Sequence, residues 1–130
     1  MTGQPAGARQ TRAQTVLVVD DHEGFRLRTR RLLERHRYLV VEAVNGADAI
    51  RRAERERPDI VLLDVHLPDM DGFEVAARLR AARSGGAILL ISTHAEADLA
   101  DRLRDSAADG FIDKADLSAS TIETMLTSLA

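Results

Sequence analysis

Carboxylates stand directly after two short aliphatic runs of this chain. Asp20 and Asp21 follow the run at 16–19, and Asp64 follows the run at 60–63. Runs of this length that are rich in β-branched residues are typical of strands buried on both faces. A charge at the end of such a strand is costly unless it faces a cleft, so the pattern predicts an acidic cleft. Taken alone, Asp64 also fits a simple turn or capping residue.

A hydroxyl and an ammonium occupy the same kind of position after two later runs. Ser92 follows the aliphatic run at 87–91, and Lys114 follows a short run at 110–113. The chain has seventeen arginines and one lysine, and that lysine is Lys114. Lysine presents a compact point charge where arginine presents a planar fork. Its use here indicates a small anionic group as its partner.

These residue types fit one chemistry when they are brought together. Three neighbouring carboxylates raise one another's pKa values and repel, and therefore call for a cation. Ligands that are all oxygen suit Mg²⁺, which keeps waters and bridges to phosphate oxygens. The Ser92 hydroxyl and the Lys114 ammonium both suit an anionic oxygen. The set predicts a phosphoryl-transfer site with a carboxylate oxygen as nucleophile.

The elements that must position these side chains alternate along the chain. Strands are expected at 16–19, 38–43, 60–64, 87–91 and 110–114, and helices at about 25–36, 46–57, 72–82, 97–107 and 122–129. Such alternation predicts right-handed βαβ units, and thus an α/β fold with a parallel sheet covered on both faces. Because the carboxyl ends of parallel strands share one rim, where ligands bind, the site residues should meet there. In the loop after the third strand, Pro68 and Gly72 are turn signals and Asp71 is the expected N-cap.

Length and composition favour a single domain. The chain has 130 residues, 45% of them hydrophobic, and contains neither cysteine nor tryptophan. We expect a domain over 15–130 after a mobile tail at 1–14. No apolar run approaches the roughly 20 residues of a membrane span. The net charge of −3 gives no global basic field for nucleic acid, and the absence of cysteine agrees with a cytoplasmic location.

Over about 15–129 the chain resembles the receiver domain of two-component response regulators. The residues that carry this resemblance are the pair Asp20-Asp21, Asp64 with Leu67-Pro68-Asp69-Met70-Asp71-Gly72 after it, Ser92, Phe111 and Lys114. The resemblance implies a flavodoxin-like, doubly wound sheet of five parallel strands in the order 2-1-3-4-5, with five helices. Segments 92–94 and 114–117 are most similar to receivers that precede helix-turn-helix DNA-binding outputs.

The resemblance also implies roles for the acidic residues. Asp64 would be phosphorylated by the phosphohistidine of a sensor histidine kinase or of a phosphotransfer protein. Mg²⁺ would be held by Asp21, Asp64 and the backbone carbonyl of His66, with Asp20 acting largely through water. The chain would be a signalling module that catalyses its own phosphorylation and dephosphorylation, rather than an enzyme with a separate substrate.

Two further residues match the switch pair of this family. Ser92 and Phe111 would reorient when the phosphate arrives, while Lys114 contacts the phosphate. The change would reach a face formed by the helix at 97–107, the strand at 110–114 and the helix at 122–129. The sequence leaves open whether this face then forms a homodimer. We expect contact with DNA only through an output domain that this chain lacks, and no contact with membrane.

Two positions depart from the family's pattern. Many members have proline after the lysine, in a cis peptide, whereas this chain has Ala115. A cis bond before any other residue costs about 3–4 kcal/mol, so we expect a trans bond and a differently shaped loop. Thr93 stands where a smaller alanine is common, which predicts a narrower mouth to the pocket.

Three other functions fit the sequence less well. An aspartate-nucleophile phosphatase or phosphotransferase resembles a family with an Asp-x-Asp pair after the first strand, but here Asp20 and Asp21 are adjacent. A degenerate receiver that only binds protein partners is disfavoured because all the site residues are present. A flavin carrier would need a Ser/Thr/Gly-rich phosphate cradle after the first strand, and this loop has none.

Overall fold

The computed structural model describes residues 13–93 and 97–129. Most of the expected tail, at 1–12, lies outside these residues, as do 94–96. In chain order the elements are β1 (Thr15–Val19), α2 (Glu23–Arg35), β2 (Leu39–Ala43), α3 (Gly46–Glu56), β3 (Ile60–Asp64), α4 (Gly72–Ala82), β4 (Ala87–Ser92), α5 (Ala97–Arg104), β5 (Gly110–Asp113), the 3₁₀ helix η1 (Lys114–Asp116) and α6 (Ala119–Leu129). The predicted alternation of strands and helices is confirmed.

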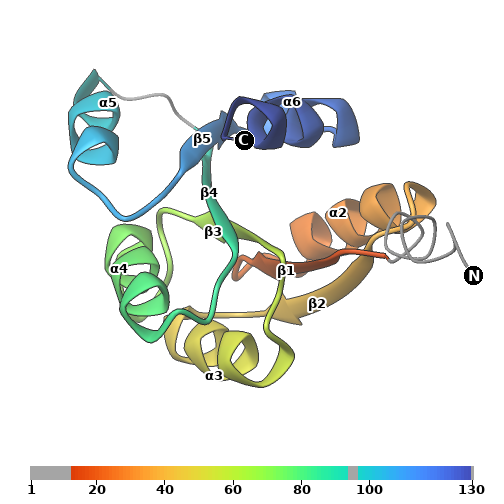
Figure 1. Ribbon diagram of the computed structural model, residues 1–130, viewed down its shortest axis with the longest axis horizontal. Coiled ribbons are helices and arrows are strands. Elements are labelled where there is room, and N and C mark those ends of the chain that lie inside the picture. The colour runs from red at the N-terminus through yellow and green to blue at the C-terminus, as the bar shows by residue number, and fades with distance from the viewer. Residues whose placement is uncertain (1–12, 94–96, 130) are drawn as a thin grey trace, which may run out of the picture.

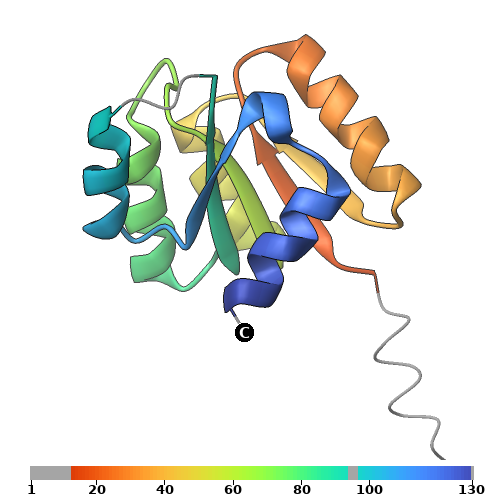
Figure 2. The same ribbon diagram turned by 90° about the horizontal axis from the view of Figure 1, so that it is seen from above.

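The strands form one parallel sheet in the order β2-β1-β3-β4-β5. Helices α3, α4 and α5 cover one face, and α2 and α6 cover the other (Figures 1 and 2). The α/β class and the flavodoxin-like strand order are confirmed, as are the five α-helices within the described residues. This topology arises because parallel neighbours need crossover helices, which must pack on the faces of the sheet.

Strand residues divide between two hydrophobic clusters according to their alternation. In β1, Val16 and Val18 pack in the cluster under α2 and α6. Leu17 and Val19 pack in the opposite cluster, under α3, α4 and α5. Because successive strand side chains point to opposite faces, this parity also determines the face on which each residue at a strand end will lie.

Several predicted boundaries differ from the structure, among them the start of the last helix, α6, at 119 rather than 122, and two of the differences have a local cause. Helix α5 ends at Arg104 rather than near 107, because the Ser106 hydroxyl donates to the Leu103 carbonyl and turns the chain. Strand β5 ends at Asp113 rather than 114. The Asp113 carboxylate accepts the backbone N–H of Ala115 at 2.9 Å and so starts η1 at the lysine.

The structure confirms two local predictions about loops at this end of the sheet. Asp71 is the N-cap of α4, where its carboxylate accepts the Phe73 N–H at 2.7 Å. No cis peptide occurs in residues 13–93 and 97–129, so the bond before Ala115 is trans, as expected.

Within the same ranges, no helix has the length and apolar character of a membrane span.

Candidate functional site

The predicted site residues gather at the carboxyl rim of the sheet. Asp20 directly follows β1, Asp64 ends β3, Ser92 ends β4 and Lys114 directly follows β5. The side chains of Asp20, Asp64 and Ser92 are almost completely buried. Burial of two carboxylates side by side is costly without compensation, so their partners determine what the site can do.

Strand parity divides these residues between two faces. By the alternation of strand residues, Asp20 and Asp64 belong to the face of the sheet that α2 and α6 cover. Lys114, two residues after Ile112, belongs to the same face. Ser92 has the parity of the opposite face, and so does Phe111, which packs against the cluster under α3, α4 and α5. Strand register sets Ser92 beside Asp113, two residues beyond Phe111. At this rim the charged centre, formed by Asp20, Asp64 and Lys114, therefore belongs to one face of the sheet. The predicted switch pair belongs to the other face.

Lys114 joins the two buried carboxylates. Its ammonium lies 2.6 Å from Asp20 Oδ2 and 3.4 Å from Asp64 Oδ2, with only 13% of the side chain exposed. The ammonium also lies 4.4 Å from the centroid of the Phe25 ring, on α2. Charge-assisted bonds and the negative face of the ring both favour a cation here. These contacts show that the Lys114 ammonium has anionic partners here, and its role in a phosphoryl-transfer site stays a prediction.

The two buried carboxyl groups are perturbed in opposite directions. Burial raises the pKa of Asp20, but the hydrogen bond from Lys114 and the backbone N–H of His22 outweigh it, so the net pKa is lowered. Burial raises the pKa of Asp64, and the His66 N–H and Lys114 only partly oppose it, so the net pKa stays above the usual value. A further cation near Asp64 would therefore favour its ionised form.

The loop after β1 completes an acidic cluster. Ligand atoms of Asp20, Asp21, Asp64 and His22 all lie within 4.8 Å of one another. Asp21 is exposed, and the His22 Nδ1 lies 3.0 Å from Asp20 Oδ1 and 3.2 Å from Asp21 Oδ1. Three carboxylates supply the hard oxygen ligands that Mg²⁺ prefers, so the donor set fits that ion. A surface or boundary role is predicted for His22 from the sequence, and its side chain is 72% exposed.

The loop from Asp64 to Gly72 closes tightly around the end of β3. The His66 N–H donates to Asp64 Oδ1 at 3.0 Å, and the Gly72 N–H donates to the Val65 carbonyl at 2.8 Å. A Cβ at Gly72 would lie 2.4 Å from the Asp64 carbonyl oxygen and 2.8 Å from the Val65 Cα. Only glycine permits this approach of two backbones. That the His66 carbonyl binds metal stays a prediction.

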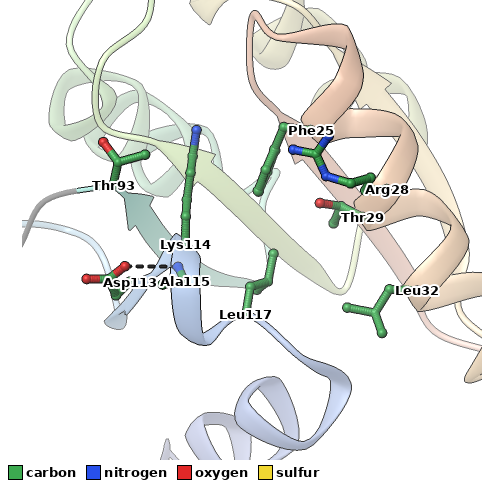
Figure 3. A pocket seen from close by; sticks show the side chains of 9 residues that line it. All are labelled: Phe25, Arg28, Thr29, Leu32, Thr93, Asp113, Lys114, Ala115 and Leu117. Carbon is green, nitrogen blue, oxygen red and sulfur yellow. Dashed lines mark hydrogen bonds between the residues drawn. The ribbon is translucent and has the colours of Figure 1, made fainter.

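A pocket of about 440 Å³ opens beside the charged centre (Figure 3). Its walls come from α2 and from the β4 and β5 ends, and its lining residues are Phe25, Arg28, Thr29, Leu32, Thr93, Asp113, Lys114, Ala115 and Leu117. Both positions that depart from the family's pattern, Thr93 and Ala115, therefore border this opening. That Thr93 narrows its mouth stays a prediction. Phe25 carries no signal in the sequence beyond its helical spacing.

Comparison with known proteins agrees with this geometry. The family described as the response regulator receiver domain matches residues 16–126. A Pseudomonas aeruginosa protein described as a transcriptional regulator is 40% identical over 100 residues, which cover 76% of this chain and 48% of that protein. Sporulation initiation phosphotransferase F of Bacillus subtilis is 30% identical over 95 residues, which cover 73% of this chain and 77% of that protein.

A solved structure gives the same result. The signal receiver domain described as that of the response regulator NarL from Mycobacterium tuberculosis superposes with a TM-score of 0.79 at 34% identity. The match covers 89% of this chain and 95% of that one. The chain spans about half the length of several curated relatives that it matches.

Proposed function

Since the chain belongs to the response regulator receiver domain family, whose function is to accept a phosphoryl group on an aspartate, we propose that Asp64 is the acceptor. The observation that carries this assignment is the bond of the single lysine to both buried carboxylates, Asp20 and Asp64. The donor would be the phosphohistidine of a sensor histidine kinase or of a phosphotransfer protein.

In the proposed step a carboxylate oxygen of Asp64 attacks the phosphorus of the phosphohistidine. The new P–O bond forms as the P–N bond breaks, and the donor imidazole leaves with the electron pair and takes up a proton. Charge is spread over three phosphoryl oxygens in such a transfer. Lys114 already lies 3.4 Å from Asp64 and would hold one of these oxygens, while the hydroxyl of Ser92 at the neighbouring strand end would hold another.

Mg²⁺ is the cofactor we propose for the acidic cluster. Asp21 and Asp64 would hold it directly with the backbone carbonyl of His66, and Asp20 would act largely through water. Bound there, the ion would neutralise charge on the transferring group. The raised pKa of the buried Asp64 supports this, because a nearby cation favours the ionised carboxylate that acts as nucleophile.

We further propose that phosphorylation changes the face formed by α5, β5 and α6. Phe111 is half-buried against the cluster that contains Leu99 of α5, and Ser92 has the same strand parity. A shift of Ser92 toward a phosphoryl group would therefore act on the packing between β5 and α5. The name of the Pseudomonas relative suggests a transcriptional output for this face, and a homodimer on phosphorylation is a second use of it.

The test is intact mass spectrometry after incubation with a small phosphodonor and Mg²⁺. We expect a gain of one phosphoryl group in the wild type, none in Asp64→Asn, and none when a chelator removes the metal. Asp59→Asn is the matched control, because Asp59 lies at the opposite end of the same strand and binds the Thr15 N–H. Labelling that persists in Asp64→Asn would refute the assignment, as would labelling that is indifferent to the chelator.

A further inference from the structure

A second contact holds the loop that follows Asp64. The exposed carboxylate of Asp69 accepts two backbone N–H groups from the first turn of α3, those of Gly46 at 2.7 Å and Ala47 at 2.9 Å. The first N–H groups of a helix have no partner within the helix. Here Asp69, which lies more than twenty residues away along the chain, takes two of them, and the Asn45 side chain takes the next, that of Asp48.

Packing strengthens this link between the loop and α3. Gly46 is buried beneath Met70, and a Cβ at Gly46 would lie 2.4 Å from Met70 Cγ. The bonds from Ala47 and Gly46 also hold the pKa of Asp69 below its usual value. Two consecutive residues at the tip of the loop thus contact one helix terminus, and the attraction is largely electrostatic because the terminus is positively polarised.

The base of the same loop carries the proposed phosphorylation site. His66 and Asp71 form an isolated antiparallel bridge, and the His66 N–H fixes one oxygen of Asp64. The seven residues at 65–71 are therefore held both at their base and at their tip. A change at the tip reaches the Asp64 carboxylate through a short stretch of restrained backbone.

We propose that Asp69 is a positioning residue of the metal site, which raises Mg²⁺ affinity by tying loop 65–71 to α3. This inference rests on the proposed function, because it concerns the same site. Groups that orient the ligands of a metal, without touching it, commonly change its affinity by 10–100-fold. Asp69 acts through the backbone at His66 and through the orientation of Asp64.

The experiment compares Asp69→Ala with Asp48→Ala. Asp48 lies in the same first turn of α3, but its carboxylate accepts the Val44 N–H and pairs with Arg51 rather than holding the loop. Both variants remove one negative charge from this helix terminus. Mg²⁺ is titrated into each labelled protein and followed by the amide shifts of Asp64 and its neighbours, while hydrogen exchange reports the mobility of the His66 amide.

We expect Asp69→Ala to bind Mg²⁺ about tenfold more weakly and to exchange the His66 amide faster before metal is added. Asp48→Ala should stay within about twofold of the wild type in affinity. If Asp69→Ala is unfolded, Asp69→Asn takes its place; it keeps one acceptor oxygen, and its expected loss is about threefold.

Two results would overturn the inference. One is an unchanged affinity in a folded Asp69 variant. The other is an equal loss in Asp48→Ala, which would mean that charge, rather than the tether, is responsible. Failure of the wild type to bind Mg²⁺ would instead refute the proposed function. Normal binding and labelling in both wild type and Asp69→Ala would refute only the role of Asp69.

Discussion

Replacing Lys114 by methionine removes the charge that compensates two buried carboxylates. Asp20 is fully buried and lies 2.6 Å from the ammonium, and Asp64 lies 3.4 Å from it. Removing one partner of a buried pair commonly costs about 3–5 kcal/mol, because the other charge is left unpaired. The variant should therefore lose more unfolding free energy than a variant in which an exposed ion pair is broken.

Protonation limits this loss and makes it depend on pH. Protonating a carboxyl group costs about 1.36 kcal/mol for each pH unit above its pKa. With an ordinary pKa of 3.8, this free-energy cost at pH 7 is about 4 kcal/mol. At about pH 5 the same step costs about 1.6 kcal/mol. We therefore expect Lys114→Met to lose about 3 kcal/mol of unfolding free energy at pH 7, and no more than about 1.6 kcal/mol at about pH 5.

The sign follows from the direction of the pKa of Asp20. Burial alone raises this pKa, but Lys114 and the His22 N–H lower it overall. In the wild type, the ionised Asp20 stabilises the fold at pH values above its pKa in the unfolded chain. This contribution is lost as pH falls through its lowered pKa in the folded protein. Without Lys114 burial dominates and the folded pKa is raised. The Lys114→Met variant then keeps its stability at low pH and loses it as pH rises through the pKa of Asp20 in the folded protein.

Urea unfolding in metal-free buffer, followed by far-ultraviolet circular dichroism, measures both values. Arg51→Met is the control, because Arg51 is 71% exposed and pairs only with Asp48 within the described residues. It should cost less than about 1 kcal/mol at either pH. An equal loss for Lys114→Met at both pH values would contradict the reasoning, since it would mean that lost packing, rather than an unpaired charge, sets the stability.

Two further predictions concern other parts of the structure. Burial raises the pKa of Glu42, but hydrogen bonds from two arginines of α2 lower it overall. Thermal unfolding should therefore show Glu42→Gln about 1 kcal/mol less stable near pH 7, a deficit that vanishes as pH falls through the lowered pKa. Gly72→Ala should lose about 2–3 kcal/mol in urea unfolding and bind Mg²⁺ more weakly, since its Cβ would meet the Asp64 carbonyl. Gly24→Ala, which meets only the end of a flexible side chain, should change stability by less than about 0.5 kcal/mol. Equal losses for the two glycine variants would contradict this account.

The strand ends were predictable because the sheet is organised by short aliphatic runs. Each run ends at a polar residue, so the positions of Asp20, Asp64, Ser92 and Lys114 at one rim follow from the parallel topology. The switch position of Phe111 came only from the resemblance. The role of each residue in transfer and switching stays a prediction.

Contacts that depend on side-chain direction could not be predicted in this way. Phe25 has ordinary helical spacing, and its place beneath the Lys114 ammonium depends on how α2 packs on the sheet. The bond from Asp69 to α3 joins two loops whose relative position is set by the whole fold. The end of α5 depended on one local competitor, the hydroxyl of Ser106, which helix propensity does not resolve.

The pairing of Lys114 with Asp20 also has a consequence for folding. The two residues are 94 positions apart, and Lys114 and Asp64 are 50 apart. Contacts between residues this far apart in sequence form only when the intervening chain closes into a loop, which costs conformational entropy. During synthesis the aspartates of β1 and β3 are made long before β5 can dock beside β4. Until then Asp20 and Asp64 have no Lys114 beside them, so the charged centre arises only in a chain whose last strand is in place.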